Sequence, residues 1–307
     1  MARVGLAIGG AALVLVGGAV AFWGPTSSAE QRTDPIGEVD RVQLGDGAGS
    51  VEIRYAPGGR GEVTQQVRRW GAALWGGDGA VEHRVEGGAL VLDTDCGWGC
   101  SVSYQVTLPA PVPVEGELGS GSLTVVGMRS VRAEVGSGEV DVQEVPGPVN
   151  VRASSGSVQV RGTDGPVEVR TGSGHVELAD LGGRVEVEAS SGGITGRGLR
   201  GAEIVADASS GSIELELTGP RNASLSTGSG GIDLVVPADR YRVDADAGSG
   251  GADIEVVQDP SAEKRLTLSS GSGHINVRSW GGPAPTGWFA SLRGTRAPGR
   301  ALSWQKA

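Results

Sequence analysis

Hydrophobic and polar residues alternate along most of the chain, in short runs separated by turns rich in glycine and proline. From Gly136 the chain reads GSGEVDVQEVPGPVNVRAS, in which Val140 and Val142, and then Val149 and Val151, alternate with polar residues on either side of a Pro-Gly turn. Alternation with a period of two, bounded by turn residues, predicts strands with one buried face. Each such unit therefore predicts two short strands and two turns.

The unit recurs nine times, and each copy carries a Gly-Ser-Gly or Ser-Ser-Gly turn. The third residues of successive turns, from Gly121 to Gly273, are 17 to 23 residues apart. A fixed period of this size is typical of repeat proteins, in which each unit stacks on its neighbours. We predict an all-β fold for residues 118–280, a parallel β-helix (β-solenoid) with coils of about 18 residues. An antiparallel sandwich or barrel with glycine-rich hairpins is the alternative.

The alternation also predicts which side chains face inward. The inward positions hold Val, Ile, Leu, Ala and Thr and no aromatic residue, which suits a narrow, flattened coil and agrees with an aromatic content of 4%. The outward positions carry charges of both signs, as expected of a solvent-exposed face. These outward residues include Arg132, Glu134, Arg152, Glu168, Arg170, Glu186 and Glu188.

A serine occupies the middle of every turn, so stacked coils would place a line of hydroxyl groups along one edge. Serine suits tight turns because its hydroxyl bonds the local backbone, which is a sufficient structural explanation. The functional hypothesis is a flat polar stripe that contacts a repetitive ligand such as cell-wall glycan. The stripe consists of Ser120, Ser137, Ser155, Ser173, Ser191, Ser210, Ser229, Ser249 and Ser272.

The N-terminus predicts export. Residues 4–23 are an uncharged apolar run after Arg3, long enough to span a bilayer as a helix. We predict a transmembrane anchor over residues 1–24 with the remainder outside the cytoplasm, followed by a polar linker over residues 25–36. The alternative is a signal peptide that is cleaved, which would leave a secreted protein.

Residues 37–117 are irregular and rich in predicted strands. We expect them to cap the solenoid, with Trp70 and Trp75 as bulky cap residues and the stretch from Gly49 to Ile53 as a degenerate first repeat. Cys96 and Cys100 are the only cysteines, and a close, even pair in an exported chain predicts a structural disulfide. Residues 281–307 form a tail with basic and aromatic residues that we expect to be disordered.

Charge and motifs exclude several kinds of chemistry. A net charge of −10 argues against nucleic-acid binding, which needs a basic surface. His175 and His274 follow equivalent turns but lie five repeats apart, too far to share a metal. No recognised catalytic motif is present. We therefore expect no enzyme activity, no catalytic or metal-binding residues and no cofactor.

The Gly-Ser-Gly-x-hydrophobic-x-hydrophobic repeats, with the segment from Cys96 to Pro109 before them, resemble a bacterial envelope family known as putative adhesins with a domain of unknown function. The resemblance covers residues 37–280. It implies a β-solenoid displayed at the cell envelope, without catalytic residues. The first hypothesis is a membrane-anchored, non-enzymatic solenoid that binds or scaffolds envelope components, with cell-wall glycan or an envelope protein as partner. The alternatives are an envelope-stress sensor acting through a membrane partner and an enzyme acting on polysaccharide.

Overall fold

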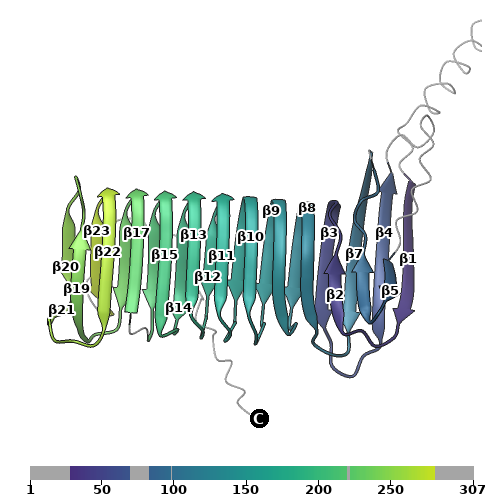
Figure 1. The fold of residues 1–307 in the computed structure, drawn as a ribbon, viewed down its shortest axis with the longest axis horizontal. Helices are drawn as coiled ribbons and strands as arrows, with labels where there is room; N and C mark the ends of the chain where they lie inside the picture. The colour runs from purple at the N-terminus through teal and green to yellow at the C-terminus, as the bar shows by residue number, and fades with distance from the viewer. Residues whose placement is uncertain (1–27, 70–82, 98, 220–221, 281–307) are drawn as a thin grey trace, which may run out of the picture.

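The computed structural model describes residues 28–69, 83–97, 99–219 and 222–280. The predicted anchor over residues 1–24, Trp70, Trp75 and the tail over residues 281–307 lie outside them. Within the described residues every regular element is a β-strand (Figure 1). No helix of these residues is long and apolar enough to cross a membrane.

The centre of the molecule is a parallel β-solenoid. Neighbouring coils pair in parallel register, with Val149 beside Val167 on one strand and Val158 beside Val176 on the next. Each coil gives one strand to a first row and one to a second, and in β8 to β10 a single bent strand serves both rows (Figure 1). The predicted solenoid is confirmed, and the antiparallel sandwich or barrel is wrong. From the coil at β8 onward the strands are β8 (Pro113–Val126), β9 (Ser130–Gln143), β10 (Val149–Arg161), β11 (Val167–Ser173), β12 (Val176–Ala179), β13 (Val185–Ser191), β14 (Ile194–Leu199), β15 (Glu203–Ser210), β16 (Ile213–Leu217), β17 (Asn222–Ser229), β18 (Ile232–Val236), β19 (Arg240–Asp246), β20 (Ala252–Glu255), β21 (Val257–Gln258), β22 (Arg265–Ser272) and β23 (Ile275–Ser279).

Aliphatic side chains fill the space between the two rows. Val140, Val142, Val151 and Val160 are fully buried, as the alternation predicts. The expectation of an aromatic-free interior is wrong at the ends, where the side chains of Tyr104 and Tyr241 are buried. Each hydroxyl there donates a hydrogen bond to a backbone carbonyl. The acceptors are the oxygens of Asp93, at 2.7 Å, and Pro237, at 2.9 Å.

The third residue of the turn is glycine for two physical reasons. In Gly156, for example, φ is +120°, a conformation that residues with a side chain rarely adopt. A Cβ atom at this position would also overlap the carbonyl oxygen of Gly138 in the preceding coil. The same overlap recurs from coil to coil, so the glycine column is required by the close stacking of the corners.

At the N-terminal end the coils do not stack in chain order. The coil formed by β2 (Arg41–Leu44) and β3 (Ala48–Tyr55) lies between the coil formed by β6 (Ala89–Leu92) and β7 (Cys100–Leu108) and the coil of β8. Gly49 lies beside Gly121, and Val51 beside Leu123. The stretch from Gly49 to Ile53 is therefore a repeat unit, as predicted.

Three strands with antiparallel partners close this end. β4 (Gly61–Arg69) pairs with β7, β1 (Ser28–Ile36) pairs with β4 along its whole length, and β5 (His83–Glu86) pairs with β6. The described part of the predicted linker over residues 25–36 is thus a strand. The edge of β4 supplies backbone partners, so β1 forms without the hydrophobic alternation by which strands are recognised in a sequence.

The C-terminal end shows a second exchange of order. β22 and β23, the last strands in the chain, lie between the coil of β17 and β18 and the coil of β19 and β20. The expectation that the nine repeats stack one after another is therefore wrong for the last two. The inward residues of the inserted coil are mostly aliphatic, including Leu268 and Ile275, and the buried hydroxyl of Ser270 donates to the carbonyl oxygen of Gly230 at 3.0 Å. The displaced coil exposes Arg242 and Asp244, which suits the end of the rod.

Candidate functional site

The serine column is a continuous line of exposed side chains. Ser137 lies beside Ser155, Ser155 beside Ser173, and the register continues to Ser229 beside Ser272. All nine predicted serines are exposed. Ser249 follows a different geometry, since its backbone nitrogen donates to the carbonyl oxygen of Gly271 at 3.3 Å. The column therefore runs in register through eight serines, with Ser249 beside its end.

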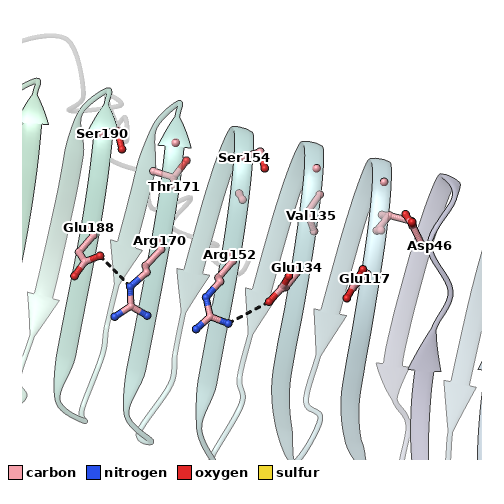
Figure 2. Close-up of a pocket in the computed structure, with 15 residues that line it drawn as sticks. Asp46, Glu117, Glu134, Val135, Arg152, Ser154, Arg170, Thr171, Glu188 and Ser190 are labelled. Atoms are coloured by element: carbon pink, nitrogen blue, oxygen red, sulfur yellow. Dashed lines mark hydrogen bonds and ion pairs between the residues drawn. The ribbon is translucent and has the colours of Figure 1, made fainter.

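A groove runs along the same edge, next to the serine column. Its volume is about 640 Å³, and it crosses the corners of β8, β9, β10, β11 and β13. One side is a line of charged residues, which Figure 2 shows across these neighbouring strands. The floor is formed by the first residue of each turn, which has a small side chain or none. The line consists of Glu117, Glu134, Arg152, Arg170 and Glu188, with Asp46 beside Gly119 at one end of the groove, and the floor residues are Gly119, Gly136, Ser154, Gly172 and Ser190.

The two arginines of the groove differ in their partners, although they lie side by side in the register. Arg170 contacts Glu168, Glu186 at 3.5 Å and Glu188 at 2.9 Å, which occupies its Nε and both terminal nitrogens. Arg152 contacts Glu134 alone among the described residues, through one terminal nitrogen at 3.2 Å. Its side chain is 46% exposed, against 35% for Arg170. Arg152 therefore keeps unpaired N–H donors at the groove.

His175 and His274 are exposed and far from each other, whereas the largely buried His83 lies 3.6 Å from a carboxylate oxygen of Asp34. Nε2 of His175 is 2.9 Å from the hydroxyl of Thr195, and Nε2 of His274 is 2.9 Å from a carboxylate oxygen of Asp253. They are four coils apart rather than five, because the coil of His274 is inserted before the end coil. The described residues contain no group of three or more side chains placed to hold a metal ion.

The two cysteines lie at the capped end, away from the groove. Cys96 and Cys100 form a disulfide with a Cα to Cα distance of 5.7 Å. The bond closes the short loop that leads into β7, and Cys96 packs against the core. This position corresponds to the structural role expected from the sequence.

Groups with shifted pKa values lie at the two ends of the rod. Burial, together with the nearby Asp239 carboxylate, raises the pKa of Tyr241 to about 12. Burial also raises the pKa of Tyr104 well above its usual range. The hydrogen bond from Lys264 lowers the pKa of Asp239, the residue just before the displaced coil. The residues with shifted pKa values therefore take part in contacts that stabilise the two ends of the rod, and none of them lines the groove.

A family model matches residues 105–279, more than half of the chain, and its description is Toastrack DUF4097. The chain belongs to this family. No curated protein matches this Toastrack chain. A crystal structure of a putative adhesin from Parabacteroides distasonis is 13% identical, with 81% of this chain and 97% of that chain covered and a TM-score of 0.44.

Two further solved structures have similar coverage and lower TM-scores. A putative adhesin from Bacteroides fragilis is 12% identical and covers 83% of this chain and 98% of its own, with a TM-score of 0.35. A putative lipid binding protein from Parabacteroides distasonis is 10% identical and covers 82% of this chain and 97% of its own, with a TM-score of 0.34. Identities this low carry no information about a ligand.

The serine line was predictable from the sequence, whereas the groove beside it was missed. Its sequence signal is the first turn residue, which is Gly or Ser in every repeat. In each coil of the groove this residue lies two positions after the outward charged residue. The row of small floor residues therefore runs parallel to the line of charged residues. The sequence predicts the two columns separately, but only the register shows that they border one hollow.

Proposed function

We propose that the protein is a non-enzymatic, exported solenoid that binds an extended polymer of the cell envelope along the corner edge. The observation that carries the proposal is the groove together with the in-register serine column. Both present the same kinds of chemical group at successive coils, and strands in a sheet are about 4.8 Å apart. A polymer with a similar repeat can make the same contact many times, so weak contacts add up along its length.

The N-terminal sequence supports placement at the envelope. An uncharged run over residues 4–23 is long enough to anchor the chain in a membrane, and the disulfide is typical of an oxidising compartment. With the chain anchored before β1, the rod would extend away from the membrane, and its corner edge would face the envelope polymers. Cleavage of the same segment would give a secreted form with the same binding edge.

The test is sedimentation of the purified protein with isolated bacterial cell-wall sacculi. Replacement of Ser137, Ser155 and Ser173 by alanine removes central hydroxyls, and we expect weaker co-sedimentation. Ser154→Tyr combined with Ser190→Tyr fills the groove floor at positions that already carry a Cβ atom, and we expect a larger loss. Ser224→Tyr, on an exposed position outside the groove lining, is the matched control.

Two outcomes would contradict the proposal. One is unchanged sedimentation of the groove-filled variant, and the other is an equal loss for the Ser224→Tyr control. Circular dichroism spectra of all variants establish that the solenoid is intact.

A further inference from the structure

We propose that the groove selects an uncharged glycan whose carbonyl or hydroxyl oxygens accept hydrogen bonds from Arg152. This inference rests on the proposed function and names the ligand class and the residue that recognises it. It starts from the unequal environments of two arginines that share one column and one groove.

Arg170 is surrounded by carboxylates, which contact all three of its nitrogens and leave it fewer free N–H groups than Arg152 has. Glu168, Glu186 and Glu188 together engage its Nε and both of its terminal nitrogens. Arg170 therefore serves to neutralise three carboxylates that stacking brings close together. A guanidinium group held in this way is part of the scaffold.

Arg152 has the opposite surroundings. In its own column the coil on one side supplies Glu134, and the coil on the other side supplies Arg170, which cannot accept a hydrogen bond. The outward residue two positions earlier, Asn150, donates its amide to Glu168 at 2.7 Å rather than accepting from Arg152. A guanidinium group has five N–H donors. Those of Arg152 that Glu134 does not engage are available to an acceptor in the groove.

The charge of the groove determines the kind of acceptor. Its lining has four carboxylates, those of Asp46, Glu117, Glu134 and Glu188, against two guanidinium groups. An anionic polymer would meet net repulsion from these carboxylates, so phosphate-rich and uronic-acid polymers are disfavoured. Uncharged amide and hydroxyl oxygens accept from Arg152 without this cost, as in a linear glycan of N-acetylated sugars.

The dimensions of the groove agree with this class. Its lining spans five neighbouring coils in the first row, from Glu117 to Glu188, which is about 19 Å at the spacing of strands in a sheet. The floor of glycine and serine admits the chain close to the backbone. The adjacent serine hydroxyls both donate and accept, as the hydroxyls of a sugar require.

The experiment is titration calorimetry of the full chain with three hexasaccharides at low and high salt. The probes are β-1,4-linked hexamers of N-acetylglucosamine, which are uncharged, and of glucosamine, which are cationic, together with an α-1,4-linked hexamer of galacturonic acid, which is anionic. We expect the uncharged hexamer to bind most tightly, with an affinity that changes little with salt. Tighter and salt-sensitive binding of either charged hexamer would overturn the ligand class.

Arg152→Gln and Arg170→Gln form a matched pair, because both remove one charge from the same column. We expect Arg152→Gln to weaken binding of the uncharged hexamer about tenfold or more, as for loss of a hydrogen bond from a charged donor. Arg170→Gln should lower thermal stability and leave the affinity within about twofold. Equal affinity of wild type and Arg152→Gln would overturn the role of Arg152.

The assay with sacculi separates failure of this inference from failure of the proposed function. Binding to sacculi without binding to any hexamer would reject the uncharged-glycan class and leave the envelope-binding function standing. Binding to neither would reject the proposed function itself.

Discussion

The middle coils and the end coils of this rod have the same two-strand plan, but they differ in how the chain passes through them. From β8 to β18 each coil lies on the one before it in the sequence. At the C-terminal end the chain passes over one position, which the later strands β22 and β23 fill. At the N-terminal end it passes from β7 to β8 over a position that the earlier strands β2 and β3 already fill. The middle coils have aliphatic interiors, whereas the outermost coils contain Tyr104 and Tyr241.

This difference shows how a repeat array is ended. A middle coil has a partner on both faces, so any coil with the same columns can replace it. An outermost coil has one face without a neighbour, and exposed strand edges are sites of unwanted pairing. In β19 the displaced coil carries the exposed charges of Arg240, Arg242, Asp244 and Asp246, and the short strand β21 pairs with its start.

Side-chain contacts also stabilise the segments that connect the displaced coil to the rest of the rod. Lys264, just before the inserted coil, contacts the Asp239 carboxylate and lies 5.9 Å from the centre of the Tyr241 ring. Arg242 donates to the carbonyl oxygen of Pro260 at 2.7 Å. These contacts join the segments that enter and leave the displaced coil. These contacts stabilise the exchanged order of the last two coils. The repeated inward residues by themselves are also compatible with coils that stack in chain order.

The largest effect is expected from a glycine of the middle column. In Gly156→Ala the new Cβ would overlap the carbonyl oxygen of Gly138 at a φ of +120°. We expect a loss of at least about 3 kcal/mol in the free energy of unfolding, measured by urea denaturation. Ser155→Ala, one residue earlier and exposed, is the control and should change stability by less than about 0.5 kcal/mol.

The same substitution at the end of the rod sharpens the contrast. Gly250→Ala also brings a Cβ against the preceding coil, at the carbonyl oxygen of Gly273. Because only the end coil depends on it, we expect local loss of amide protection there rather than global destabilisation. Equal global losses for Gly156→Ala and Gly250→Ala would refute the distinction between middle and end coils.

Removal of the inserted coil tests the exchanged order. A chain that stops at residue 264 lacks β22 and β23, which provide the neighbouring strands for β19 and β20. We expect residues 240–258 to lose amide protection in hydrogen exchange, while residues 130–199 keep theirs. A chain that stops at residue 280 is the control. Retained protection over residues 240–258 in the shorter chain would show that the displaced coil can stack directly on β17 and β18.

High pH should open the ends before the middle. The pKa of Tyr241 is about 12 in the folded chain, above the value near 10 of an unfolded tyrosine, and the pKa of Tyr104 is raised as well. A raised pKa means that the folded state holds the proton more tightly. The stability it contributes is complete below pH 10 and is lost as pH rises toward the folded pKa.

The measurement is urea denaturation between pH 9 and pH 12, followed by circular dichroism. We expect the midpoint to fall above pH 10, and to fall less steeply in Tyr241→Phe. An identical pH dependence in wild type and in Tyr241→Phe would contradict the assignment to this hydroxyl.

The smallest effect concerns one strained position in the turns between the middle coils. Glu144 has a φ of +55°, a conformation that costs a non-glycine residue roughly 1–2 kcal/mol. Part of the gain from glycine is offset by its greater freedom in the unfolded chain. We expect Glu144→Gly to raise the free energy of unfolding by about 0.5 kcal/mol, measured by urea denaturation. Glu139→Gly, on the outward face of β9, should lower it instead.

Some features of the fold could be predicted from the sequence because they repeat. Val140, Val151 and Val160 are buried where the alternation places them, and Ser137 and Ser155 lie side by side on the exposed edge. Repetition makes each local signal count several times, so the coil, its corner and its two faces are determined together. The line of serines follows directly, because every coil places the same residue at the same corner.

The strand β1 and the order of the end coils could not be predicted in this way. β1 forms because the edge of β4 offers it backbone partners, and a backbone partner leaves no pattern of side chains. The exchange of the last two coils depends on how well the inward residues of each coil pack against those of its neighbour. The hydrophobic patterns of the two repeats are too similar for the sequence to predict their order. The groove, likewise, depends on two columns meeting at one edge.

The sequence by itself determined the period, the inward and outward faces and the glycine that each corner needs, because these depend on residues close together in the chain. The tertiary structure decided which coil lies beside which, and with it the separation of His175 from His274 and the unequal partners of Arg152 and Arg170. These depend on contacts between coils. Contacts of this kind are set by packing and by the closing of the rod's ends rather than by local pattern.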